Sequence, residues 1–306
     1  MAPATTAPAL RARLRWLSTR LRAVRAFSFP LSVLPVIVST AAMGPMARPR
    51  HDVLLASALA VLLLHAAGNL LNDYFDFRSG VDSKVDDDHG RPGRLLVRGE
   101  MTPPQVLHEA VACLILAAPA AGYLLARCGP GLLWFGGAAL AGLYAYTGPP
   151  LRLKYRALGE PLIFLVFGPL LVTGAAYAQA GRWSWTALLL SVPVGMLTTG
   201  VLLGNNIRDL DEDCAAGVKT LACKLGLKAA RLVYAFCVLA PALAVAGLVA
   251  AGVLGTAALL CLVALVPGWC LVRQALRTAR TPQIDARTAQ CAALFLVMLW
   301  LGMAIA

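Results

Sequence analysis

Nine stretches of this chain are each long and apolar enough to cross a lipid bilayer. A transmembrane helix needs about 20 mostly apolar residues, and the 306-residue sequence supplies nine such runs. They occupy residues 27–43, 53–72, 107–126, 129–146, 161–180, 183–204, 232–251, 255–272 and 288–306. The seventh and eighth runs are separated only by a short turn signal at 251–255, within 41 residues that carry no charge. The pattern predicts an all-α, polytopic membrane protein of nine transmembrane helices.

The composition supports a membrane environment and excludes most soluble classes. Hydrophobic residues make up 59% of the chain, charged residues only 14%, and the mean hydropathy is +0.72. These values do not suit the surface of a soluble enzyme, and they also exclude a disordered chain. The net charge of +12 arises in short gaps between apolar runs, without the basic stripe typical of nucleic-acid binders. We therefore expect the lipid bilayer, and no nucleic acid, as a partner.

The basic residues also predict an orientation. Of the 27 Lys and Arg residues, 23 fall in the N-terminal region and in alternate connections, and 4 fall in the remaining connections. The side richer in Lys and Arg faces the cytoplasm in membrane proteins. The sequence thus predicts a basic cytoplasmic tail at 1–26 and a single transmembrane domain at 27–306, in a prokaryotic-type inner membrane. A retained first helix is a simpler interpretation of the N-terminal region than a cleaved signal peptide.

The eight cysteines do not suggest a disulfide framework or a zinc site. Five of them lie inside apolar runs, and the sequence contains no Cys-x-x-Cys. Cys214 and Cys223 are nine residues apart, with no further Cys or His nearby. We expect all eight to be free thiols that behave as small hydrophobic residues.

Ten of the fifteen acidic residues fall in two short windows, 73–88 and 209–213. Each window closes an apolar run on the predicted cytoplasmic side. In the first, polar side chains recur at i, i+3, i+4 and i+7, which places them on one helical face. These are Asn69, Asn72, Asp73 and Asp76, with His65 one turn deeper and Asp82 beyond a Ser-Gly break. In the second window, Asn206, Asp209 and Asp213 repeat the spacing i, i+3 and i+7.

Folding alone does not favour carboxylates at these positions. Acids at a helix C-terminus face the negative end of the helix dipole, and an Asp placed centrally in a span costs roughly 2.5–3.5 kcal/mol on insertion scales. A bound cation would compensate, and carboxylate and amide oxygens are the ligands that Mg²⁺ prefers. For Asp86–Asp88 a solvated loop is the better interpretation. For Asp73, Asp76, Asp209 and Asp213 we favour a metal site, because the same face occurs twice.

Two Mg²⁺ ions between these windows could hold a diphosphate, with basic side chains neutralising the remaining charge. Arg208 lies inside the second window, and Lys219 follows Asp213 by six residues. Arg94 or Arg98 from the first long connection could also contribute. The alternative for each is a positive residue that only sets orientation.

The two windows resemble the aspartate-rich motifs of the UbiA superfamily of membrane prenyltransferases. The first motif corresponds to Asn72-Asp73-Tyr74-Phe75-Asp76 with Asp82, and the second to 205–213 followed by Lys219-Thr220-Leu221. Residues 22–35 and 146–169 resemble further family regions, so the similarity covers roughly 22–227. Details of both motifs favour the branch that prenylates 1,4-dihydroxy-2-naphthoate in menaquinone synthesis. Cys214 and Pro149-Pro150 depart from the family pattern.

The resemblance implies helices around a central cavity, with Mg²⁺ and a prenyl diphosphate bound beneath a cytoplasmic cap. Asp73, Asp76, Asp209 and Asp213 would then hold two Mg²⁺, Asn72 and Asn206 would orient metal-bound water or phosphate, and Arg208 and Lys219 would bind diphosphate oxygens. An aromatic acceptor would meet Tyr146, Lys154 and Asp82, where Asp82 would act as base and Lys154 would pair with an acceptor carboxylate. Tyr146 could instead be an interfacial aromatic.

Other functions remain open from the sequence. A natural-product aromatic prenyltransferase, a terpene cyclase or a phospholipid-forming enzyme would use the same ionisation chemistry with a different acceptor. A polytopic transporter is a different class, but it would carry polar groups near the membrane midplane. Mid-span polarity is sparse here.

Overall fold

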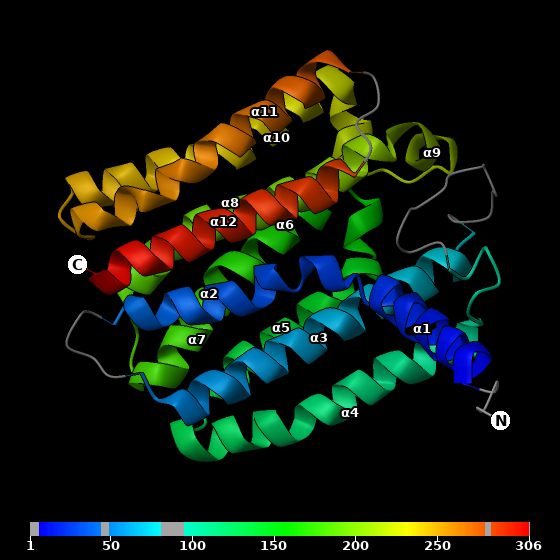
Figure 1. The fold of residues 1–306 in the computed structure, drawn as a ribbon, viewed down its shortest axis with the longest axis horizontal. Coiled ribbons are helices and arrows are strands. Elements are labelled where there is room, and N and C mark those ends of the chain that lie inside the picture. Colours follow the sequence, from blue (N-terminus) through cyan, green and yellow to red (C-terminus); the bar gives the residue numbers. More distant parts are fainter. Residues whose placement is uncertain (1–5, 44–48, 81–94, 279–282, 306) are drawn as a thin grey trace.

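The computed structural model describes residues 6–43, 49–80, 95–278 and 283–305, and its elements within these ranges are all helical (Figure 1). The all-α prediction is therefore confirmed. In chain order the elements are α1 (Thr6–Ala23), η1 (Ala26–Ser28), α2 (Pro30–Ala41), α3 (His51–Arg78), α4 (Pro103–Cys128), α5 (Leu132–Thr147), η2 (Leu153–Tyr155), α6 (Gly159–Leu165), η3 (Val166–Leu170), α7 (Leu171–Ala180), α8 (Trp185–Arg208), α9 (Leu210–Ala215), α10 (Leu221–Ala250), η4 (Thr256–Ala264), α11 (Leu265–Arg277) and α12 (Ile284–Ile305).

The number of spans differs from the sequence prediction. Within the described ranges, seven helical segments are long and apolar enough to cross a membrane, and an eighth is gained if α1 and α2 form one span bent by 54°. All nine predicted runs are helical, but α5 has only 16 residues. The nine spans expected from the sequence are therefore not confirmed.

The segment α6–η3–α7 shows how one span accommodates a proline. Pro169 has no backbone N–H to donate, and the chain widens to a π-type turn over Val166–Leu170 before the α-helix resumes. As one segment, Gly159–Ala180 is long and apolar enough to span a membrane. The turn predicted at 251–255 is present between α10 and η4.

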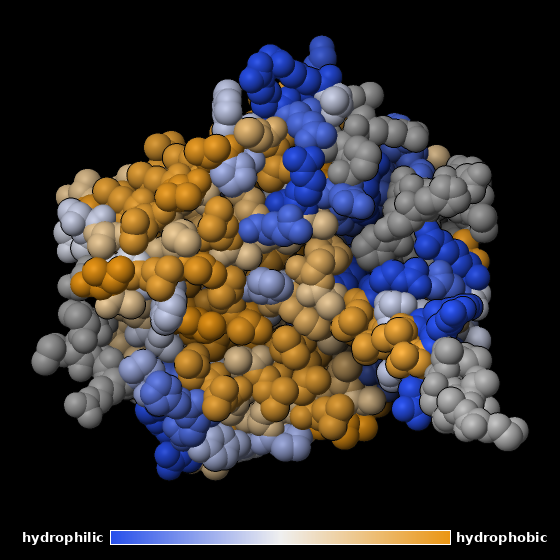
Figure 2. Space-filling view, viewed as in Figure 1, coloured by the Kyte–Doolittle hydropathy of each residue, from blue (hydrophilic) through white to orange (hydrophobic). Residues whose placement is uncertain are grey.

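Helix α8 is the central element of the bundle. It packs against α10, α12 and α6, and 78% of its apolar 18-residue stretch is buried. Outer helices present the opposite pattern, since large apolar side chains such as Leu55 on α3, Trp134 on α5 and Leu243 on α10 are exposed. Hydrophobic residues cover the middle of the face seen in Figure 2, and hydrophilic residues gather toward the ends. Such a surface suits a protein surrounded by lipid.

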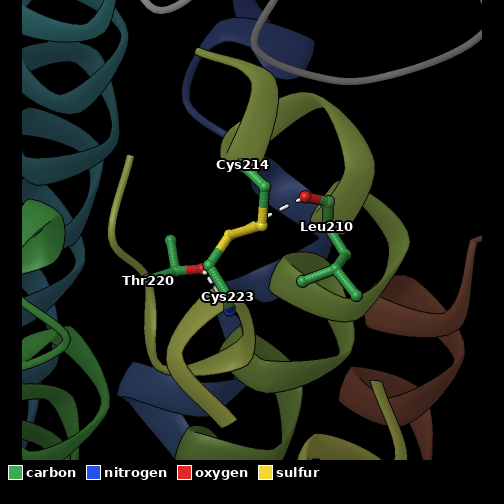
Figure 3. Close-up of a disulfide and its surroundings, with 4 residues drawn as sticks. All are labelled: Leu210, Cys214, Thr220 and Cys223. Atoms are coloured by element: carbon green, nitrogen blue, oxygen red, sulfur yellow. Dashed lines mark hydrogen bonds between the residues drawn. A yellow bond between two sulfur atoms is a disulfide. The ribbon is translucent and has the colours of Figure 1, made fainter. Parts of the chain in front are cut away.

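One cysteine prediction is wrong. Cys214 at the end of α9 and Cys223 in the first turn of α10 form a disulfide, with Cα atoms 5.8 Å apart (Figure 3). The sequence separation hid this proximity, because the chain reverses between the two helices. Thr220 caps α10 by accepting a hydrogen bond from the Cys223 amide and so fixes that reversal. The other six cysteines are free.

Candidate active site

The first motif lies on the last turns of α3, which runs without a break through Asn72, Asp73 and Asp76. All three side chains face inward, and each residue is only 4% exposed. Asn72 Nδ2 lies 3.1 Å from Asp76 Oδ2 and thus orients that carboxylate. The helical spacing read from the sequence therefore places amide and carboxylate on one buried face.

Each carboxylate of this face meets a cation from another element. Arg25 Nη2 lies 2.7 Å from Asp73 Oδ1, and Lys154 Nζ lies 2.6 Å from Asp76 Oδ2. Arg25 reaches Asp73 from the break between α1 and η1, where its φ of 52° reverses the chain. The Tyr155 hydroxyl donates a further hydrogen bond to Asp76, which also accepts from Asn72 and Lys154. The first motif is thus neutralised by side chains that lie far away in the sequence.

Lys154 lies beside the first motif. Burial alone would lower the pKa of its ammonium, but Asp76, with smaller contributions from Tyr146 and Asp213, holds this pKa well above its usual value. Arg156, in the same connection, forms an isolated parallel bridge with Lys219. The connection between α5 and α6 therefore lies between the first motif and the segment that follows the second.

The second motif spans a helix break rather than one continuous helix. Helix α8 ends at Arg208, and α9 begins at Leu210 after a turn at Asp209. The guanidinium of Arg208 donates to both oxygens of Asp209 at 2.9 Å. Its third nitrogen lies 2.6 Å from Asp285 Oδ2 at the start of α12. Arg208 is therefore held between two carboxylates.

The two asparagines of the second motif have different surroundings. Asn206 is buried and donates to Glu160 Oε1 at 2.8 Å. Asn205 accepts a hydrogen bond from Arg208 at 2.8 Å and lines the cavity. The structure thus brings Asn205, and not Asn206, to the cavity wall.

A cavity of about 350 Å³ opens beside these residues. Its polar end is formed by Arg25, Asn72, Tyr146, Asn205 and Asp285. Its remaining wall is mostly apolar and comes mainly from α3, α5 and the α6–α7 segment, with Leu132, Phe135, Leu162 and Phe167 among its residues. Tyr146, predicted to meet an acceptor, lies at the polar end.

Some predicted residues are placed elsewhere or not described. Asp82 lies outside the described residues, together with Asp86–Asp88 and Arg94. The Lys219 side chain is exposed, and only its backbone is tied to the site. Arg98 lies 3.8 Å from Glu100 in the connection before α4.

The donor chemistry of the first motif fits Mg²⁺ held jointly with a substrate. No group of three or more His, Cys, Asp or Glu side chains is close enough to form an all-protein cage within the described ranges. Mg²⁺ is usually bound through one or two carboxylates, water and substrate phosphates. The buried Asn72, Asp73 and Asp76 face supplies such a partial set.

Sequence reasoning missed several polar residues of the site. Arg25 was counted only as a topological charge, and Tyr155, Glu160, Asn205 and Asp285 received no role. Asp285 carried one usable signal, because it is an isolated acid at the start of an apolar run. The pairing of Asn206 with Glu160 depends on the packing of α6 against α8 and left no trace in local spacing.

Together the fold and the site define an integral membrane protein in which the buried aspartates of α3 adjoin Asn72, a residue that lines a largely apolar cavity. Residues 32–302 match the UbiA prenyltransferase family, and the chain belongs to this family.

Its similarity to curated proteins extends over most of the chain. It is 37% identical over 231 residues to UbiA prenyltransferase domain-containing protein 1 of Gallus gallus, covering 71% of this chain and 68% of that protein. The Drosophila melanogaster homolog is 33% identical, with 74% and 63% covered, and the Homo sapiens protein is 36% identical, with 67% and 60% covered. The chain thus spans roughly three fifths to two thirds of these relatives. These names establish the family but not the naphthoate branch.

Solved structures share the fold at low sequence identity. A UbiA homolog from Archaeoglobus fulgidus bound to GPP and Mg²⁺ superposes with a TM-score of 0.62 at 16% identity, covering 94% of this chain and 100% of that one. A digeranylgeranylglyceryl phosphate synthase gives a TM-score of 0.60 at 17% identity, with 94% and 97% covered.

Proposed function

We propose that this protein transfers a prenyl group from an allylic diphosphate to an aromatic acceptor inside the membrane, with Mg²⁺ as cofactor. The observation that carries this proposal is the connection between α5 and α6, where Lys154 binds Asp76 of the first motif and Arg156 forms a backbone bridge with Lys219 just beyond the second. This connection lies beside a largely apolar cavity lined by Asn72 and Asn205. Further support comes from the Archaeoglobus fulgidus homologs, whose structures hold GPP or DMAPP with Mg²⁺.

The diphosphate would bind at the polar end of the cavity. Asp73, Asp76, Asp209 and Asp213 would hold two Mg²⁺, with Asn72 and Asn206 as oxygen donors nearby. When bound, Mg²⁺ would neutralise charge on the diphosphate oxygens as the allylic C–O bond breaks.

Basic side chains of the protein would also neutralise charge on the diphosphate. Arg25 and Arg208 are already fixed by carboxylates, so they need little reorganisation to stabilise a departing diphosphate. Lys219 would bind an outer oxygen. The apolar wall around Phe135 and Phe167 would exclude water from the allylic cation and receive the prenyl tail.

For the acceptor we propose a 1,4-dihydroxy-2-naphthoate-type phenol, as in menaquinone-type quinone synthesis. Tyr146 would line its binding place, Lys154 would pair with its carboxylate, and Asp82 would accept a phenolic proton. We also propose that this site faces the cytoplasm, as the 23 of 27 basic residues on that side indicate.

A direct assay follows diphosphate release from geranylgeranyl diphosphate by the purified chain with Mg²⁺. The proposal expects release that depends on the aromatic acceptor, together with a prenylated product detected by mass spectrometry. Release without any acceptor would identify a cyclase, and no release with any donor would favour a transporter. A natural-product enzyme would prefer a phenol without the naphthoate carboxylate. The Asp82→Asn variant tests the proposed base, because it should lose transfer while retaining donor binding.

A further inference from the structure

Helix α1 carries an exposed apolar stripe. Its leucines are Leu10, Leu14, Leu17 and Leu21. They are 47–58% exposed, and at 3.6 residues per turn they occupy a sector of about 60°. The buried residues of this helix, Thr19 and Ala23, lie on the opposite face. The stripe therefore points away from the rest of the protein.

Arginines flank this stripe on both sides. Arg11, Arg15 and Arg22 follow one edge and Arg13 and Arg20 the other, and α1 contains no acidic residue. Arg20 and Arg22 are paired with Glu109 and Glu100. Among the described residues, Arg11, Arg13 and Arg15 form no ion pair and are exposed.

The contacts of α1 place it at the end of the bundle that holds the aspartates. Arg20 Nε lies 3.1 Å from Glu109 Oε1 on α4, and the chain that leaves α1 passes directly to Arg25, which holds Asp73. The helix is bent by 54° from the direction of α2, so it does not simply extend that span (Figure 1). Residues 10–18 are exposed on every side. Most helical stability in proteins comes from packing of an amphipathic face, and the described residues supply no such packing to residues 10–18.

We propose that α1 lies in the headgroup layer of the membrane and binds anionic phospholipids. The leucines would enter the acyl boundary, and the flanking arginines would meet lipid phosphates, which is the arrangement of interfacial amphipathic helices. The positive charge of α1 favours anionic lipid as the binding partner over a second copy of this chain, because two such arginine-rich faces would repel each other. Since α1 continues into Arg25, lipid binding would also steady the polar end of the cavity.

Hydrogen exchange of the full chain in nanodiscs tests this inference. Each disc holds one protein molecule, and discs of phosphatidylcholine alone are compared with discs in which a third of the lipid is phosphatidylglycerol. The backbone amides of 10–22 should exchange at least about tenfold more slowly in the anionic discs, and added salt should reduce the difference. Equal exchange in the two discs would overturn the proposal. Slowing that appears only when discs are loaded with two protein molecules, and not with one, would overturn it in favour of a dimer contact.

Variants separate charge from fold. Replacing Arg11, Arg13 and Arg15 together by Gln should remove the dependence on anionic lipid, whereas replacing the same three by Lys should retain it. Diphosphate release in detergent should be unchanged in both variants, since none of the three contacts the site. A Gln variant that still responds to anionic lipid would contradict the proposal, whatever its activity.

Discussion

Lys154 Nζ lies 2.6 Å from Asp76 Oδ2, and the two side chains are only 11% and 6% exposed. The lysine comes from the connection between α5 and α6, and the aspartate comes from the end of α3. This pair therefore ties the acidic face to the segment that also pairs, through the backbone of Arg156, with Lys219 beyond the second motif. A buried pair of this kind is costly to break, because the remaining partner is an uncompensated charge.

Removing the lysine should destabilise the protein more than removing both partners. Lys154→Met leaves Asp76 buried without its cation, and we expect a loss of about 3–5 kcal/mol in unfolding free energy. The double variant Lys154→Met with Asp76→Asn should recover part of this loss, and both variants should be inactive. Thermal unfolding in detergent measures the difference. A single variant as stable as the double would contradict the assigned charge pairing.

Asp285 should affect binding of the prenyl diphosphate through its contact with Arg208. Asp285→Asn weakens the contact that orients the guanidinium, and the loss of one charge-assisted hydrogen bond should raise KM for the prenyl diphosphate by about tenfold. Thr288→Val is the matched control on the same helix, because Thr288 bonds the Tyr234 hydroxyl and does not contact Arg208. Steady-state kinetics with varied donor checks this. An equal KM change in both variants would indicate a general disturbance of α12.

The disulfide should make Cys214 and Cys223 resistant to alkylation. Alkylation of the denatured, unreduced protein should label six cysteines and leave Cys214 and Cys223 unmodified. Replacing both by Ser should lower stability by about 2–4 kcal/mol, because the bridge constrains the unfolded chain. Peptide mass mapping gives the first result and thermal unfolding the second. Full labelling of all eight cysteines without reductant would contradict the bridge.

Two neighbouring glycines on α5 offer a test of whether the prenyl tail binds in the cavity. Gly136 lines the cavity, whereas Gly137 does not, and a Cβ added at either meets nothing within 4 Å. Gly136→Phe should therefore reduce turnover of a long-chain donor by about tenfold or more while sparing dimethylallyl diphosphate. Gly137→Phe should leave both donors unaffected. Equal loss with both donors in the Gly136 variant would show that the tail does not occupy this space.

Much of the fold was predictable because membrane solvation constrains it so strongly. Backbone groups in lipid must be satisfied internally, so each apolar run had to become a helix. Residues 1–26 were harder to interpret, because their six closely spaced arginines resemble a tail that only sets the membrane orientation. The helical spacing of the four leucines was visible in the sequence, but only the structure shows that this face has no protein partner.

The site was predictable where it is local and missed where it is tertiary. Asn72, Asp73 and Asp76 share one helix, so their spacing defined their common face. Arg25 and Asp285 reach the site from distant elements, and no local pattern encodes those ion pairs. The Cys214–Cys223 disulfide was missed for the same reason, since a chain reversal brings the two residues together.

The central claim is that the two aspartate motifs act as one Mg²⁺-dependent diphosphate site. Calorimetric binding of geranyl diphosphate to the wild-type chain, Asp73→Asn and Asp209→Asn, each with Mg²⁺ and with EDTA, tests it most directly. The account predicts tight binding only for the wild-type chain with Mg²⁺, and at least about a hundredfold weaker binding in either variant, because each removes a metal-binding carboxylate. Wild-type affinity in either variant, or binding that ignores EDTA, would contradict it.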